Sequence, residues 1–123
     1  MSKVKKFFVD RMYYNLNADK IYGDMTYTFD DMPNMEFNTI KKAKEAIDYE
    51  MDYVISEQLD NDETFDGNIF IYTIWESVFD ASNTVVSTKE IYAKCMLISD
   101  DSIYEELNKC WRRTHDFDVD MYV

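Results

Sequence analysis

The single histidine, His115, and the two cysteines, Cys95 and Cys110, carry the side chains that most often serve as catalytic bases or nucleophiles. Cys110 with His115 could form a pair in which the imidazole activates the thiol for attack. Cys110, however, shares a helical face with Leu107 and Trp111, so we expect a buried and inert thiol. The sequence has no glycine-rich phosphate loop and no GxSxG motif. We therefore predict no catalytic residue, no cofactor and a protein that is not an enzyme.

The loop that begins at Asp62 is the part of the sequence nearest to a metal-binding motif. Asp62, Thr64 and Asp66 match the first, third and fifth positions of an EF-hand loop, and Gly67 matches the sixth. The twelfth position is Thr73, where the motif requires a bidentate Glu. The two cysteines also lack the spacing of metal ligands. We therefore predict no metal site.

Charged residues are distributed unevenly along the chain. Between Lys44 and Lys89 the sequence has no Lys or Arg but 11 acidic residues, against totals of 25 acidic and 13 basic residues and a net charge of −12. Carboxylates without a base four residues away lose helical ion pairs and repel one another. Two interpretations stay open: a surface that attracts a cationic partner, or an ordinary solvated acidic face.

A helix over residues 39–58 must present many of these carboxylates. Apolar side chains recur there at three- and four-residue spacing, and Asn38 or Thr39 can supply the N-terminal cap. The predicted buried stripe comprises Ile40, Ala43, Ile47, Met51, Val54 and Gln58.

The other side of this helix is the best candidate for a binding surface. Glu45, Asp48 and Asp52 share a flank that points away from the stripe, and Tyr49 and Tyr53 lie beside them. Tyrosine rings supply contact area, and carboxylates pair with Arg or Lys. The alternative is that the tyrosines pack under a neighbouring loop.

The last residues, 116–123, alternate strictly between acidic and apolar types, apart from Tyr122. This pattern predicts a C-terminal strand tied into a sheet. Asp116, Asp118 and Asp120 would then form a row about 6.7 Å apart, twice the strand rise, which is comparable to the spacing of phosphates along a nucleic-acid strand. The alternative is a solvated edge strand whose charges prevent aggregation.

The remaining segments indicate further strands and one more helix. Residues 4–14 and 25–29 have strand character. Residues 68–79 have apolar side chains at both odd and even positions, as in a central strand that is buried on both faces. Residues 84–86 could pair back as a short strand. For residues 88–98 we favour a helix, because Ser87 and Glu90 fit a capping box, although a strand is the alternative.

A second capping box, Ser102 with Glu105, predicts a C-terminal helix with Leu107 and Trp111 on its buried face. Together the segments predict one compact α+β domain over residues 1–123. We expect an antiparallel sheet of four to five strands with two to three helices packed on it.

The composition indicates which classes of partner and which cellular compartment are compatible with this chain. A net charge of −12 disfavours direct binding to nucleic acid or to anionic membranes and favours basic partners. No apolar run approaches the roughly 18 residues of a membrane span, and the N-terminus lacks the apolar region of a signal peptide. The two cysteines form no disulfide framework. We expect a protein of a reducing cytoplasm.

The length, the abundance of Tyr, Asp, Asn, Ile and Lys, the base-free stretch Glu45–Thr88 and the unit MEFNTIKKAKEAID carry a resemblance. In these features the chain resembles the small acidic phage-encoded inhibitors of bacterial defence systems, among them the anti-CRISPR proteins. The resemblance implies a stoichiometric inhibitor in the bacterial host cytoplasm, one that occupies the basic nucleic-acid channel of a host nuclease complex such as a CRISPR–Cas effector.

The leading hypothesis is therefore a non-catalytic acidic inhibitor or decoy that binds a basic, nucleic-acid-binding surface by mimicry of nucleic acid. The alternative is a regulatory or structural module that binds another protein through exposed tyrosines and apolar surface. The predicted partner-binding residues are Glu45, Asp48, Tyr49, Asp52, Tyr53, Glu57, Asp60, Asp62, Glu63, Asp66, Asp116, Asp118 and Asp120.

Overall fold

The computed structural model describes residues 3–15, 18–24, 36–61, 68–96 and 101–122, and for residues 22–24, 54–61, 68, 96, 101 and 122 it describes the backbone alone. In chain order the elements are β1 (Val4–Asn15), β2 (Lys20–Asp24), β3 (Glu36–Phe37), α1 (Ile40–Asn61), β4 (Asn68–Phe79), β5 (Val85–Met96), α2 (Asp101–Arg112) and β6 (Asp120–Tyr122). The fold is α+β, as the sequence predicts.

Within the described residues the strands form one six-stranded sheet in the order β2-β1-β4-β5-β6, with β3 paired to β1. All pairs are antiparallel except β5 with β6, which run parallel. The predicted central strand is confirmed, because β4 lies between β1 and β5 along almost its whole length. The predicted strand at residues 25–29 lies outside the described residues.

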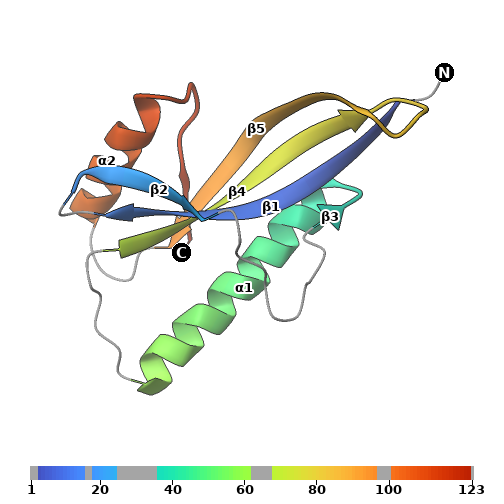
Figure 1. The fold of residues 1–123 in the computed structure, drawn as a ribbon. Coiled ribbons are helices and arrows are strands. Elements are labelled where there is room, and N and C mark those ends of the chain that lie inside the picture. Colours follow the sequence, from blue (N-terminus) through green and yellow to red (C-terminus); the bar gives the residue numbers. More distant parts are fainter. Residues whose placement is uncertain (1–2, 16–17, 25–35, 62–67, 97–100, 123) are drawn as a thin grey trace.

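The two helices cover opposite faces of this sheet (Figure 1). Ile47 and Met51 of α1 are buried against Val9 and Ile74 on one face. On the other face, α2 and the chain that follows it form a second core; its fully buried members include Tyr14, Ile71, Cys95, Leu107 and Trp111. Because β4 is covered on both faces, its apolar residues need no alternation.

Helix α1 begins as predicted. The Thr39 hydroxyl accepts a hydrogen bond from the Lys42 amide at 3.2 Å, which is the contact of an N-cap. Ala43, Ile47 and Met51 of the predicted stripe have no exposed surface. Ile40 does not belong to this core, because it is 37% exposed. The side chains of Val54 and Gln58 lie outside the described residues.

The favoured helix over residues 88–98 is wrong. Residues Val85–Met96 form the strand β5, and the predicted capping box is part of it. Thr88 pairs with Ser77 and Glu90 with Trp75 of β4, and the Ser77 and Thr88 hydroxyls are 2.9 Å apart. The stretch 85–91 is rich in β-branched residues, which favour a strand.

Two predictions at the C-terminus need correction. Helix α2 begins at Asp101, so Ser102 lies inside the helix and is not its cap. Among the described residues of the predicted strand, only Asp120–Tyr122 are a strand, and they run parallel to β5. The alternation of burial before it is as predicted, since Val119 is buried and Asp116 and Asp118 are exposed. Among the described residues, no helix is long and apolar enough to span a membrane.

Candidate functional site

The outer face of α1, which we define as Glu45, Tyr49, Asp52 and Tyr53, lies opposite the buried stripe. All four residues are exposed, and the two tyrosines retain 53% and 45% of their surface. Figure 1 shows why: α1 follows one side of the sheet and its C-terminal part runs away from the strands. Both rings therefore keep about half of their surface open to solvent, and Tyr53 also makes a contact within the chain.

Glu45 and Asp52 are the unneutralised carboxylates of this face. No ion pair joins either of them to another residue in the part of the chain that the structure describes. Helix α1 also has no acidic residue in its first turn and no basic residue in its last. The charges therefore run against the preference of the helix dipole, and the negative end of that dipole adds to the acidic C-terminal half.

Asp48, predicted for the same surface, has a different role. Lys94 of β5 donates a hydrogen bond to its carboxylate at 2.6 Å. Lys44 precedes Asp48 by four residues, but its ammonium lies over the Tyr92 ring, and the fold brings the ion-pair partner of Asp48 from 46 positions away. Glu50 of the same helix is 8% exposed and belongs to the buried side.

Other acidic residues of the base-free stretch are also engaged. Glu76 lies 3.9 Å from the Lys5 ammonium on the neighbouring strand β1. Asp80 closes the β4–β5 turn by accepting hydrogen bonds from the amides of Ser82 and Thr84, both at 3.0 Å. Of the described acidic residues in this stretch, Asp48, Glu76 and Asp80 are therefore engaged within the fold.

Several predicted site residues are not placed. Glu57 and Asp60 belong to α1, but their side chains are outside the described set. Asp62, Glu63 and Asp66 lie outside the described residues altogether.

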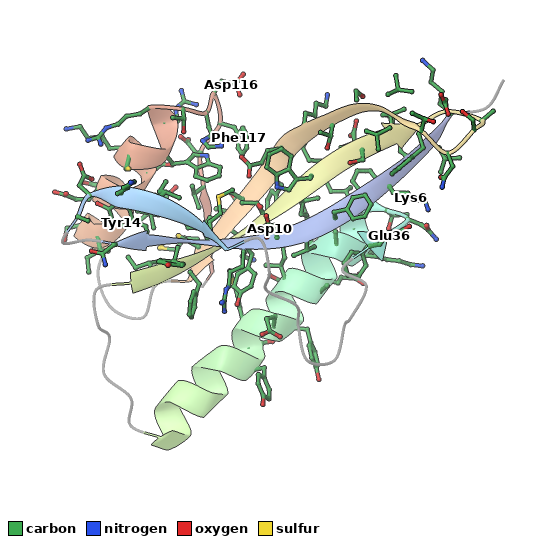
Figure 2. The ribbon with its side chains drawn as sticks, viewed as in Figure 1. Lys6, Asp10, Tyr14, Glu36, Asp116 and Phe117 are labelled. Carbon is green, nitrogen blue, oxygen red and sulfur yellow. The ribbon has the colours of Figure 1, made fainter. Side chains whose placement is uncertain are left out.

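The three aspartates of the tail do not form the predicted row. Asp116 and Asp118 precede β6, in chain that is not a strand, so the strand spacing does not apply to them. Asp118 accepts a hydrogen bond from the Asn108 amide at 3.1 Å and lies 3.8 Å from the Arg112 guanidinium. Asp116 and Phe117 lie beyond α2, on the far side of the sheet from α1 (Figure 2).

Asp120 is the tail residue that the fold brings toward α1. It pairs with Lys94 in the register of β5 and β6. Its carboxylate also accepts a hydrogen bond from the Tyr92 hydroxyl, and burial together with this contact raises the Tyr92 pKa. The Lys44 ammonium of α1 lies 4.3 Å from the centre of the Tyr92 ring. Sequence reasoning missed this cluster, because it assigned Tyr92 and Lys94 to a helix.

A second polar constellation surrounds His115. Its Nε2 contacts the carboxylate of Glu90, and its Nδ1 lies 2.9 Å from the Thr114 hydroxyl. Burial raises the pKa of Glu90, and the contact with His115 opposes that rise. An acid, an imidazole and a hydroxyl in this order could activate the hydroxyl as a nucleophile. The predicted partner Cys110 is not part of it, since its thiol faces the Asp19 carbonyl at 3.7 Å.

An open cavity of about 380 Å³ lies where α2 meets the β1–β2 turn. Its lining residues are Asp19, Ser102, Glu105, Glu106, Lys109 and Arg113. Arg113 is paired with Asp19 across this cavity at 2.9 Å. The lining contains neither Glu90 nor His115, so the acid–imidazole–hydroxyl array does not open into it.

The described residues contain no group of three or more acidic, His or Cys side chains arranged to hold a metal ion. Comparison with family models, curated proteins and solved structures found no match to this chain.

Proposed function

We propose that this protein is a non-catalytic binding protein that occupies a cationic surface of a partner through the outer face of α1. The observation that supports this proposal is the composition of that face. Two half-exposed tyrosines lie among two carboxylates that have no ion-pair partner in the described part of the chain.

The physical basis is the combination of rings and charge. Tyrosine supplies a large contact area at a low cost in side-chain entropy and is enriched among residues that dominate binding energy. Carboxylates that no ion pair neutralises remain available to Arg or Lys of a partner. The negative end of the α1 dipole acts in the same direction.

The finer form of the proposal is an inhibitor or decoy that binds a nucleic-acid-binding protein, of the anti-CRISPR or anti-defence type. Grooves that bind nucleic acid are strongly positive, and a chain with a net charge of −12 is attracted to them. Nucleic-acid mimicry would then rest on α1, because Asp116 and Asp118 do not lie on a strand.

A second candidate is a regulatory module that binds another protein chiefly through Tyr49 and Tyr53. It is favoured by the engagement of Asp48, Glu76 and Asp80 inside the fold, which reduces the exposed negative charge, while Tyr49 and Tyr53 remain about half exposed in the described part of α1. The two candidates differ in salt dependence. Exposed charges are screened beyond about 8 Å at physiological ionic strength, whereas ring contacts are not.

The test begins with capture from bacterial lysate by the wild-type chain, with identification of the bound proteins by mass spectrometry. The charge-reversal variant E45K/D52K is compared with the control E105K/E106K, which makes the same change on exposed residues of α2. Asp48 is left intact because its ion pair with Lys94 is structural. The affinity of the chain for the purified partner is then measured at low and at high salt. A competition assay measures whether the chain displaces nucleic acid from that partner.

The decoy proposal expects a nucleic-acid-binding partner, displacement of its nucleic acid, and steep salt dependence. It also expects binding to be lost in E45K/D52K and retained in the control. Salt-independent binding that is abolished by Y49A/Y53A would favour the regulatory module. If neither pair of substitutions on α1 weakens binding, the outer face of α1 is not the contact surface.

A further inference from the structure

One side of β5 has no strand partner along most of its length. The strand β4 pairs with the inner side of β5 almost from end to end. On the outer side β6 pairs with Lys94–Met96 only, so among the described residues no strand lies beside Val85–Ala93. No backbone hydrogen bond from the described turns and loops reaches Val85–Ala93 either. Figure 1 shows that this part of β5 extends past α2 along an edge of the sheet.

This free edge is exposed and carries little charge. Val85 and Val86 retain 52% and 53% of their surface, and the next three residues are exposed as well. Residues 81–89 contain no acidic residue, although the chain has 25 of them. Glu90 is the only acidic residue of β5, and its carboxylate contacts His115. A long edge strand with few charges is a site at which another strand can add.

The chemistry of this edge selects its partner. The N–H and C=O groups of an unpaired strand are matched in spacing by those of another extended chain. A second copy of this chain offers such a strand, namely its own β5. Two chains that each carry a net charge of −12 repel one another, but at β5 they meet without bringing unengaged carboxylates together. We propose that two copies pair β5 against β5 in antiparallel orientation and form a dimer with one continuous sheet.

The register of this pairing follows from the bulges and the charges of β5. Two register shifts interrupt its pairing with β4, and Ser87–Glu90 is the regular part between them. A two-fold axis at the middle of this part passes through Thr88 or Lys89. An axis at Lys89 places two ammonium groups opposite each other, which is unfavourable. The axis therefore lies at Thr88, and the short ladder around it makes a weak, concentration-dependent dimer.

The dimer also arranges the two copies of α1. A two-fold axis between antiparallel strands of one sheet is perpendicular to that sheet, so each face of the sheet continues into the same face of the second copy. Both outer faces of α1 then lie on the same side of the joined sheet. This consequence rests on the proposed function: a partner with an extended cationic groove contacts two acidic faces at once, which raises the apparent affinity.

Sedimentation velocity of the wild-type chain tests the dimer without any partner. Over about a hundredfold range of chain concentration, we expect the sedimentation coefficient to rise from that of a monomer toward that of a dimer. High salt should increase the dimer fraction, because it screens the repulsion between two acidic chains. The decoy contact has the opposite dependence, since salt weakens it.

A monomer at every concentration and salt would overturn the dimer. That result leaves the contact of α1 with a cationic partner standing, because E45K/D52K tests that contact separately. A dimer in the wild type together with a failed lysate capture would remove the proposed function and keep the dimer.

Cysteine cross-linking tests the register. In T88C the two new thiols flank the axis, and opposite residues of antiparallel strands have Cα atoms about 4.5–5.5 Å apart, within the range of a disulfide. V85C is the matched control, because it places an exposed thiol on the same strand but about 20 Å from its counterpart, six residues of strand away. We expect T88C to form a covalent dimer on oxidation and V85C to stay monomeric. Failure of T88C to cross-link, or equal cross-linking of both, would contradict this register.

An added charge at the axis gives an independent test. T88D places two carboxylates opposite each other and should raise the dissociation constant of the dimer by at least about tenfold. A81D adds the same charge to the exposed β4–β5 turn, outside the paired segment, and should change the dissociation constant little. Far-UV circular dichroism checks that both variants keep the fold. Equal weakening by the two variants would overturn the edge contact, because total charge would then govern the association.

Discussion

The Lys94 ammonium lies 2.6 Å from the Asp48 carboxylate and thereby ties the last third of β5 to the middle of α1. The lysine side chain is 18% exposed and the aspartate side chain 50%. An acidic residue whose ion-pair partner is distant in the sequence therefore helps to fix the helix on the sheet. This orientation leaves Tyr49 and Tyr53 facing solvent.

Replacing Asp48 should weaken the fold, whereas replacing its neighbour Asp52 should not. We expect D48A to lower the free energy of unfolding by about 1 kcal/mol, the upper range for a partly exposed ion pair. D52A removes a carboxylate without an ion pair in the described chain and should change it by less than about 0.5 kcal/mol. Urea denaturation measures both.

The two substitutions make the same chemical change inside one helix, so the gain in helix propensity from Ala is shared. Their difference reports the Lys94 contact. Equal effects of the two substitutions would mean that the pair contributes nothing measurable to stability.

Ile40 and Ile47 provide a second matched pair on α1. The spacing of the sequence assigns both to one buried stripe, but Ile47 is fully buried and Ile40 is 37% exposed. I47A should cost about 2–5 kcal/mol, because it removes buried methyl groups and leaves a cavity. I40A should cost less than about 1 kcal/mol. Similar losses in thermal or urea unfolding would contradict the placement of Ile40.

The sequence predicts α1 well and β5 poorly, for a physical reason. The signals of α1 are local: a cap at Thr39 and apolar residues three and four apart. In β5, Ile91 and Cys95 are four apart, a spacing that suits a helix and also a strand of period two. The pairing with β4 decides between them, and this pairing involves residues distant in the sequence.

The candidate site also has features that the local sequence predicts and features that depend on contacts between distant segments. The exposure of Tyr49 and Tyr53 follows from the periodicity of a single helix, so it could be predicted. The partners of Asp48, Glu76 and His115 could not, because each contact joins separate elements. A capping-box motif at Glu90 also concealed its role as the partner of His115.

Asp80 should titrate below the usual range of an aspartate. Its carboxylate accepts hydrogen bonds from the Thr84 amide and from Ser82, which lower its pKa from the ordinary 3.8. The stability that these bonds contribute is present above pH 3.8 and is lost as pH falls through the lower folded value. A carboxyl-carbon NMR titration should give a midpoint below 3.8.

The variant D80N removes this titration and serves as its control. The stability difference between the wild type and D80N should be largest near neutral pH and shrink in acid. A difference that does not change with pH would show that the ionised form of Asp80 has no special role in the turn.

Both thiols should be unreactive in the folded chain. Burial raises the pKa of Cys95 to about 12 and also raises that of Cys110, so at neutral pH almost no thiolate is available. With an aromatic disulfide reagent we expect slow modification, with Cys110 reacting before Cys95, because Cys110 is 8% exposed and Cys95 is fully buried. In urea, where the chain is unfolded, both thiols should react rapidly. The C110S variant assigns the two phases, and rapid modification of Cys95 without denaturant would contradict its burial beneath α2.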